Sequence, residues 1–241
     1  MAASQDPTPE TWAAVFAHMS GGVLSEQTVS TVLELITSLA KDTLPGSVGA
    51  GVTLVDEDGS HRTAAATDPI VERLDALQYE LGEGPCLTAT HEAVPVRVDD
   101  LSGERRWPRW SAAAAQDGTS SVLSVPIVHA GRSFGAVKVY SPRTHGYTDQ
   151  SEEILERFAA QASILLANMH TLAAAEELNE KLLQALRDRD LIATGKGIVM
   201  LRENLDADAA MRRLLEMSAQ RRITVREVAA EVVASIHIES V

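Results

Sequence analysis

Two glycines flank a single lysine at Gly195-Lys196-Gly197, inside a region whose sequence is otherwise patterned as helix. Glycines let backbone N–H groups approach an anion and a lysine neutralises its charge, so the first hypothesis is a phosphate-binding loop. The spacing excludes a P-loop, because Asp190 stands where that motif needs its first glycine and Gly197 stands where it needs Ser or Thr. Each glycine inside a helix costs about 1 kcal/mol relative to alanine. We therefore expect another use for this stretch, as a smooth and positively charged surface.

The rest of the sequence offers few residues for catalysis or metal binding. Cys86 is the only cysteine, which excludes an internal disulfide, and the seven histidines are scattered without the spacing of zinc ligands. We expect no metal and no cofactor. A small-molecule hydrolase would need a Ser/His/Asp arrangement, a metal cluster or paired carboxylates, and none of these stands in a recognisable frame. The expectation is that the chain is not an enzyme.

Composition predicts a globular chain with an uneven distribution of charge. The 241 residues are 45% hydrophobic, enough for a buried core, and the net charge of −13 argues against a nucleic-acid binder built on the whole protein. Residues 1–175 hold 11 basic and 22 acidic side chains, whereas residues 186–230 hold nine basic and seven acidic ones. Positive charge is thus concentrated near the C-terminal end. No apolar run is long enough to span a membrane and the start has no signal-peptide pattern, so we expect a cytoplasmic protein.

Periodicity along the chain predicts an α+β domain after a loose N-terminal segment, residues 1–22. The next elements, in order, are a helix over 25–44, strands over 47–55 and 61–67, a helix over 68–81, a short strand over 94–101, a helix over 111–118 and strands over 120–129 and 133–141. The turn Ala130-Gly131-Arg132 joins the last two strands as a hairpin. This order indicates an antiparallel sheet with helices packed on one face, and a pocket over residues 66–120.

A long helix is expected to follow, because residues 148–202 are helical in pattern and contain neither Pro nor Gly before Gly195. Its apolar stripe would bury itself best against a second copy of the chain. We therefore expect a homodimer through a parallel coiled coil, with residues 169–182 as the connecting helix. The alternative is a single helix packed on its own domain. Four leucines are the expected dimer contacts: Leu172, Leu178, Leu182 and Leu186.

Two shorter amphipathic helices are predicted after the long one. Asp206 is the expected N-cap of the first, and Thr224 with Glu227 matches a capping box at the start of the second. Three helices of this size make a minimal bundle of roughly 50 residues, which would be marginally stable alone.

Three stretches within residues 23–168 resemble a known family of sensor modules. QYELGEGPCLTA, DLSGERRWPRW and SVLSVPIVHAGRSFGAVKVYS are similar to GAF domains, and closely so to the actinobacterial subgroup. The resemblance implies a GAF fold with a pocket for an unknown small-molecule ligand between the sheet and residues 66–120. Five residues are the candidates for this pocket: Tyr79, Cys86, Arg105, Trp107 and Trp110.

The identity of the ligand stays open. GAF domains that bind cyclic nucleotides carry an Asn-Lys…Phe…Asp-Glu signature, and Ser141 and Arg143 depart from its first two positions. Cys86 has three interpretations: a site of bilin attachment, a redox thiol, or a small hydrophobic core residue. Trp107 and Trp110 either stack on a planar ligand or close the edge of the core.

Residues 183–236 resemble the ANTAR domain, an RNA-binding antitermination module. The residues that carry the resemblance are Ala185, Leu186, Arg189, Ile192, the run 195–200, Ala210, Leu214, Ser218, Arg226, Val228 and Ala229. The resemblance implies a dimer that binds a pair of small RNA stem-loops, one per protomer. The chain departs from the family at Gly195, where alanine is usual, and at Leu215, where a basic residue is usual.

This resemblance offers an explanation of the two glycines. Small residues at 195 and 197 would let RNA approach the helix closely, while Arg189 and Lys196 contact phosphates from one face. The expected RNA-binding residues are Arg189, Gly195, Lys196, Gly197, Arg212, Arg213, Arg221, Arg222 and Arg226. We thus expect a transcription antiterminator in which the GAF domain senses a signal and the dimer binds RNA stem-loops.

Two alternatives remain for the C-terminal helices. They could form a helix-turn-helix-like DNA-binding regulator, although nine basic against seven acidic side chains leave a net charge of only +2 for duplex phosphates. They could also serve protein interaction in a GAF protein that binds a small molecule.

Overall fold

The computed structural model describes residues 26–238, which divide into two units after Thr171. The expected N-terminal segment, residues 1–22, lies outside the described residues. The first unit contains the sheet, and the second contains the C-terminal helices.

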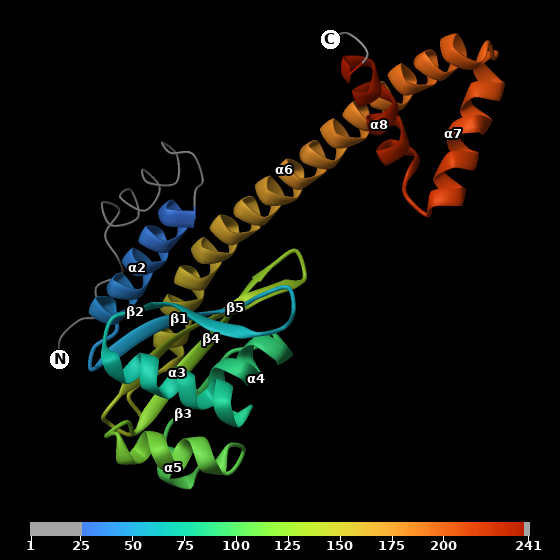
Figure 1. The fold of residues 1–241 in the computed structure, drawn as a ribbon. Coiled ribbons are helices and arrows are strands. Elements are labelled where there is room, and N and C mark those ends of the chain that lie inside the picture. The colour runs from blue at the N-terminus through green and yellow to red at the C-terminus, as the bar shows by residue number, and fades with distance from the viewer. Residues whose placement is uncertain (1–25, 239–241) are drawn as a thin grey trace. The chain divides into compact units, whose positions relative to one another are not determined.

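Five antiparallel strands form the centre of the first unit, in the order β2-β1-β5-β4-β3 (Figure 1). The strands are β1 Gly49–Val55, β2 His61–Ala66, β3 Val96–Val98, β4 Ser121–His129 and β5 Arg132–Ser141. The predicted hairpin between β4 and β5 is confirmed, since His129 pairs with Arg132. Ala130 and Gly131 between them have φ of 48° and 79°, the positive values that a type I′ turn requires.

Helices cover both faces of the sheet (Figure 1), whereas the sequence interpretation placed them on one face. The first part of α6, which spans Asp149–Glu203, packs on one face together with α2 Glu26–Thr43. The other face is covered by α3 Pro69–Leu81, α4 Pro85–Glu92 and α5 Pro108–Gln116, and η1 Leu101–Gly103 lies before α5.

The alternation of side chains along β5 explains the two layers. Val137 and Val139 are buried in the cluster with α2 and α6, whereas Ala136 and Tyr140 are buried in the cluster with α3, α4 and α5. Because successive residues of a strand point to opposite faces, a strand that is apolar at every position must be covered on both sides.

Glycine allows α3 to approach the sheet. A Cβ atom added at Gly51 of β1 would lie 2.6 Å from a methyl group of Val71 and 2.8 Å from Cε of Lys138. Any larger side chain at this position would push α3 away from the strand. The close contact brings the polar residues of α3 over the middle of the sheet.

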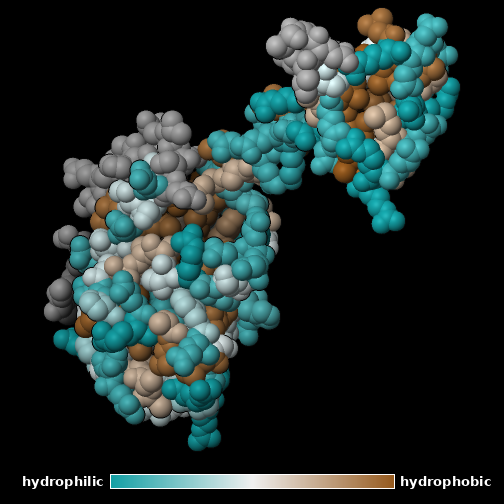
Figure 2. Space-filling view, viewed as in Figure 1, coloured by the Kyte–Doolittle hydropathy of each residue, from teal (hydrophilic) through white to brown (hydrophobic). Residues whose placement is uncertain are grey.

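In the second unit, the end of α6 packs with α7 Ala207–Arg221 and α8 Val225–Ile238. The buried core of this bundle is small: Val199, Ala210, Leu214 and Val228 form its cluster, and Ile198 and Ala229 are also buried. Partly buried apolar residues surround it, and Figure 2 shows hydrophobic residues at the surface of this unit. The three-helix bundle expected from the sequence is therefore present, with a core that is modest for its size.

Both predicted helix caps of the bundle are confirmed. The Asp206 side chain accepts a hydrogen bond from the Ala209 N–H at 2.7 Å at the start of α7. Thr224 and Glu227 form the capping box of α8, in which the Thr224 N–H donates to Glu227 Oε2 at 2.7 Å and the Glu227 N–H donates to Thr224 Oγ1 at 3.2 Å.

Within residues 26–238, no helix is both long and apolar enough to cross a lipid bilayer. In the same residues, no three His, Cys, Asp or Glu side chains gather into a group that could hold a metal ion.

Candidate functional site

A cavity of about 850 Å³ opens on the first unit beside the loop that joins α3 to α4. Its lining comes from the two central hairpins, the α3–α4 loop, α4 and the start of α5: Val55, Ser60, His61, Tyr79, Gly82, Glu83, Gly84, Leu87, Thr88, Thr90, His91, Glu92, Trp107 and Ser133. Two of the five predicted pocket residues, Tyr79 and Trp107, line this cavity. Their role in binding a ligand stays a prediction.

Three aromatic side chains form part of the cavity wall: His61, Tyr79 and Trp107. The rings of Tyr79 and His61 stack, with centroids 6.0 Å apart and planes at 22°. Trp107 is only 5% exposed and its indole N–H donates to Thr88 Oγ1 at 3.1 Å. Burial lowers the pKa of His61 below its ordinary value, and the opposing charge of Asp56 does not cancel this effect. The lowered pKa favours the neutral imidazole near pH 7, so this ring adds an uncharged aromatic surface to the wall.

Three predicted pocket residues lie elsewhere. Cys86 is fully buried in the first turn of α4, where its N–H donates to Gln78 Oε1 at 2.8 Å and burial raises the pKa of its thiol. Trp110 is fully buried, and its indole N–H donates to the Leu74 carbonyl at 3.0 Å. Arg105 is exposed and does not line the cavity. Cys86 and Trp110 are thus core residues, because side chains without accessible surface can neither attach a bilin nor stack on a ligand.

Behind Tyr79 lies a buried polar cluster that the sequence interpretation missed. Lys138 of β5 and Asp75 of α3 are both fully buried, and Lys138 Nζ lies 2.5 Å from Asp75 Oδ2. Lys138 also donates to Thr53 Oγ1 at 2.9 Å, and the Tyr79 hydroxyl lies 2.9 Å from the same Thr53 oxygen. Asp75 Oδ1 has no hydrogen-bond partner within the described part of the chain. Hydrogen bonds therefore run from the cavity wall to a buried ion pair.

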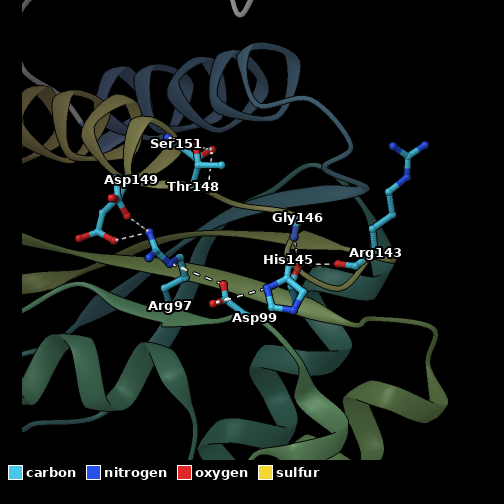
Figure 3. A network of polar contacts seen from close by, with 10 residues as sticks. Arg97, Asp99, Arg143, His145, Gly146, Thr148, Asp149 and Ser151 are labelled. Carbon is cyan, nitrogen blue, oxygen red and sulfur yellow. Dashed lines mark hydrogen bonds and ion pairs between the residues drawn. The ribbon is translucent and has the colours of Figure 1, made fainter. Parts of the chain in front are cut away.

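A second polar network fastens the start of α6 to the edge strand β3 (Figure 3). Arg97 Nη1 lies 2.7 Å from Asp149 Oδ1 and 3.4 Å from Glu152 Oε2, both at the start of α6. Asp99 lies 3.6 Å from the Arg97 guanidinium and 3.8 Å from His145 Nδ1. The cyclic-nucleotide signature would stand in this segment. Here Asp149 pairs with Arg97 of β3 and helps hold α6 on the sheet.

In the second unit, Gly195 is a packing residue. It is buried, and a Cβ atom added there would lie 2.9 Å from Cβ and 3.0 Å from Cα of Ala229 in α8. This corrects the prediction that Gly195 faces RNA, because α8 already occupies that side of α6. Gly197 differs, since a Cβ atom added there would meet nothing within 4 Å in the described chain outside its own helix backbone. Gly197 therefore remains a candidate for a surface contact.

The predicted basic rim is partly engaged inside the bundle. Three of its arginines form ion pairs: Arg213 with Glu203, Arg221 with Glu231, and Arg226 with Asp188. The side chain of Arg189 is 76% exposed, with Nη2 3.4 Å from its neighbour Asp190. Over the described range, no carboxylate pairs with Lys196, Arg212 or Arg222. These four cations are the most available to an anionic partner.

All four predicted dimer leucines are exposed. Leu172 is 37%, Leu178 67%, Leu182 59% and Leu186 42% accessible, and the neighbouring Leu183 is 44% accessible. Large apolar side chains in one region of a helix are a costly surface for a chain in water. They are available for contact with a second copy, and such contact stays a prediction.

Comparison with protein families gives two matches. The model described as GAF domain matches residues 26–167, and the model described as ANTAR domain matches residues 180–233. None of the curated proteins compared with this chain matches it.

Several solved structures share the fold of the first unit. The free methionine-R-sulfoxide reductase of Thermoplasma acidophilum is 18% identical and aligns over 61% of this chain and 97% of its own, with a TM-score of 0.52. The GAF domain of a phosphoenolpyruvate-protein phosphotransferase from Coxiella burnetii is 13% identical over 72% of this chain and 99% of its own, with a TM-score of 0.55. The corresponding GAF domain from Acinetobacter is 17% identical over 68% and 96%, with a TM-score of 0.51. At these identities the likeness concerns the fold alone.

Proposed function

This chain belongs to the GAF domain family and carries an ANTAR domain at residues 180–233, and from this premise we propose that it is an RNA-binding transcription antiterminator. In this proposal a small molecule in the GAF cavity is the signal, and the dimeric protein binds paired RNA stem-loops in the cytoplasm. The chain acts as a regulator and not as an enzyme.

The observation that carries the proposal is the ANTAR match on a compact bundle with available cations. Lys196 on α6 and Arg212 on α7 have no ion-pair partner in the described residues, and Arg189 is well exposed. Phosphates are contacted by such side chains, and a shallow helical surface suits the splayed bases of RNA loops better than a duplex groove. Arg213, Arg221 and Arg226 support the bundle itself through their ion pairs, so we assign them a smaller part in binding.

The exposed leucines on α6 support the dimer in this proposal. Binding a pair of stem-loops requires two bundles. Pairing of the apolar stripe of α6 with that of a second copy would bring two bundles together. A ligand that favours one arrangement of the dimer would then change the affinity for RNA.

The proposal is tested by measuring the binding of the full-length protein to a set of short RNA stem-loops and to duplex DNA at two salt concentrations. We expect preference for stem-loops. Lys196→Ala should weaken RNA binding at every sequence and reduce the slope of log K against log salt by about 1, because one phosphate contact is lost.

Lys181→Ala is the matched control. Lys181 lies on the same helix and is exposed, with its ammonium 2.5 Å from Glu177, and it stands outside the predicted RNA-binding residues. Loss of RNA affinity in both variants would indicate a non-specific charge effect. A preference for duplex DNA, or a loss of helicity in Lys196→Ala, would contradict the proposal.

A further inference from the structure

The charges that line the GAF cavity have one sign. Among its lining residues in the described chain are two carboxylates, Glu83 and Glu92, and no lysine or arginine. Glu83 is held in place, because its Oε1 accepts hydrogen bonds from the backbone N–H groups of Arg109 and Trp110 at 2.9 and 3.1 Å. Glu92 is exposed at the end of α4, with no ion pair to any described residue. Glu92 is thus the lining carboxylate without a partner among the described residues, whereas one oxygen of Glu83 is occupied by the first turn of α5.

Two cations next to the lining residues are matched by carboxylates. Arg106 pairs with Glu104 at 2.6 Å and also lies 4.4 Å above the Trp107 ring, and Lys138 pairs with Asp75 at 2.5 Å behind Tyr79. An anionic ligand would therefore lose its hydration without meeting a lysine or arginine among the described lining residues, and it would face the carboxylates of Glu83 and Glu92.

The shape and polarity of the walls favour a planar ring. Tyr79 and His61 form a stacked pair, and Trp107, which is 5% exposed with Arg106 over its ring, closes the wall and is fixed by its hydrogen bond to Thr88. Because burial lowers the pKa of His61, this ring adds no positive charge near pH 7. Aromatic surfaces bind other rings by stacking and attract cations through their negative faces.

We propose that this cavity binds a positively charged aromatic molecule, with its ring against Tyr79 and His61 and its charge directed to Glu92. The proposal rests on the sensing role given to the cavity above, and it names the chemical class of the signal. It excludes cyclic nucleotides and other phosphate esters as ligands of this site.

The test compares three probes that share one ring and differ in charge. Calorimetry on the full-length protein near pH 7 would measure binding of tryptamine, indole and indole-3-acetate, with cyclic AMP as a fourth probe. We expect tryptamine to bind about tenfold more tightly than indole-3-acetate, since its ammonium gains a partly solvated ion pair and the acetate group meets like charge. Indole should lie between them, and cyclic AMP should not bind.

Glu92→Gln should reduce the preference for tryptamine over indole-3-acetate by about threefold. Glu153→Gln is the matched control, because it removes an exposed carboxylate from α6 that does not line the cavity, and it should leave the preference unchanged. The proposal is overturned if indole-3-acetate or indole binds as tightly as tryptamine, if no probe binds at millimolar concentration, or if both variants behave alike. No RNA is present in this assay, so a negative result would refute the proposed ligand class without bearing on RNA binding.

Discussion

Lys138 lies in the middle of an apolar strand, and its charged end is buried completely against Asp75. Removing two charges from water costs several kcal/mol for each ion, and their attraction offsets this cost only where the geometry is good. The ammonium donates a hydrogen bond to Thr53 Oγ1 at 2.9 Å, and the Thr63 hydroxyl donates one to the carboxylate at 2.7 Å. Asp75 Oδ1 has no partner among the described residues, so the carboxylate is only partly satisfied. Such a cluster makes the layer between α3 and the sheet sensitive to the loss of either charge.

Removal of one partner should therefore be far more harmful than removal of both. Lys138→Met leaves Asp75 buried without its cation, and we expect a loss of about 3–5 kcal/mol in the free energy of unfolding of the first unit. The double variant Asp75→Leu with Lys138→Met leaves no buried charge and should be more stable than Lys138→Met alone. Urea denaturation followed by tryptophan fluorescence measures the stability of both variants, since Trp110 is buried in the apolar cluster between α3 and the sheet.

Glu153→Gln serves as the control for these variants and should change the free energy of unfolding by less than about 0.5 kcal/mol, as surface substitutions usually do. Equal stability of Lys138→Met and the double variant would mean that the ion pair does not act as a unit.

The residues of the cavity show how far side-chain type alone can locate a site. Tyr79 and Trp107 line the cavity. Cys86 and Trp110 come from the same two stretches of sequence, but they are buried in the core. The difference is tertiary: Cys86 lies on the buried side of α4, where its N–H donates to Gln78 of α3, and the Leu74 carbonyl of α3 accepts a hydrogen bond from the Trp110 indole. A lysine within an apolar strand was the one sequence signal for the buried ion pair.

The contact between α6 and α8 explains Gly195, one of the two glycines in the Gly195-Lys196-Gly197 run. Helices approach most closely where one of them has no side chain, and Gly195 lies against Ala229 at such a point. Gly197 has no neighbour of this kind in the described residues. Both positions lie in one helix, and only Gly195 packs against α8. Substitutions at the two positions therefore distinguish the effect of helix propensity from the effect of helix packing.

Alanine at these two positions should shift stability in opposite directions. Gly197→Ala should stabilise the bundle by about 1 kcal/mol, because alanine favours the helix and meets nothing. Gly195→Ala should destabilise it by about 1 kcal/mol, because the clash with α8 costs about 1–3 kcal/mol and exceeds the gain in propensity. Native-state hydrogen exchange of the α7 and α8 amides measures both changes. Stabilisation of the bundle by Gly195→Ala would show that α8 does not pack closely there.

Local signals predicted most elements, and long-range packing decided the rest. The caps at Asp206 and Thr224 and the hairpin at Ala130-Gly131 were predicted because their geometry depends on a few adjacent residues. Helix α4 was missed because its eight residues are too short for a periodic pattern, although Pro85 after Gly84 is a start signal. The second helical layer was also missed, since it depends on both faces of β4 and β5 being apolar.

One continuous helix belongs to both units of the molecule, because α6 spans Asp149–Glu203 and the division between the units falls after Thr171. Arg97 fastens its start to the sheet, and Asp188 near its end pairs with Arg226 of α8. A signal in the cavity and RNA on the bundle would then be linked through this helix and its partner in a dimer. Linkage of this kind is reciprocal, so the ligand and RNA must change each other's affinity by the same factor.

The angular positions of the leucines around α6 indicate which of them contribute most to the predicted dimer. At about 100° per residue, Leu172, Leu182 and Leu183 fall within about 60° of Leu186, whereas Leu178 lies about 80° away on the flank. Leu182→Gln with Leu186→Gln should therefore convert a dimer into a monomer in sedimentation equilibrium. Leu178→Gln should weaken the dimer less, because this flank position contributes less of the contact, although Leu178 is the more exposed side chain at 67%. If exposure alone drove association, Leu178→Gln would weaken the dimer most. A wild-type chain that sediments as a monomer at every concentration would remove the pairing of α6 altogether.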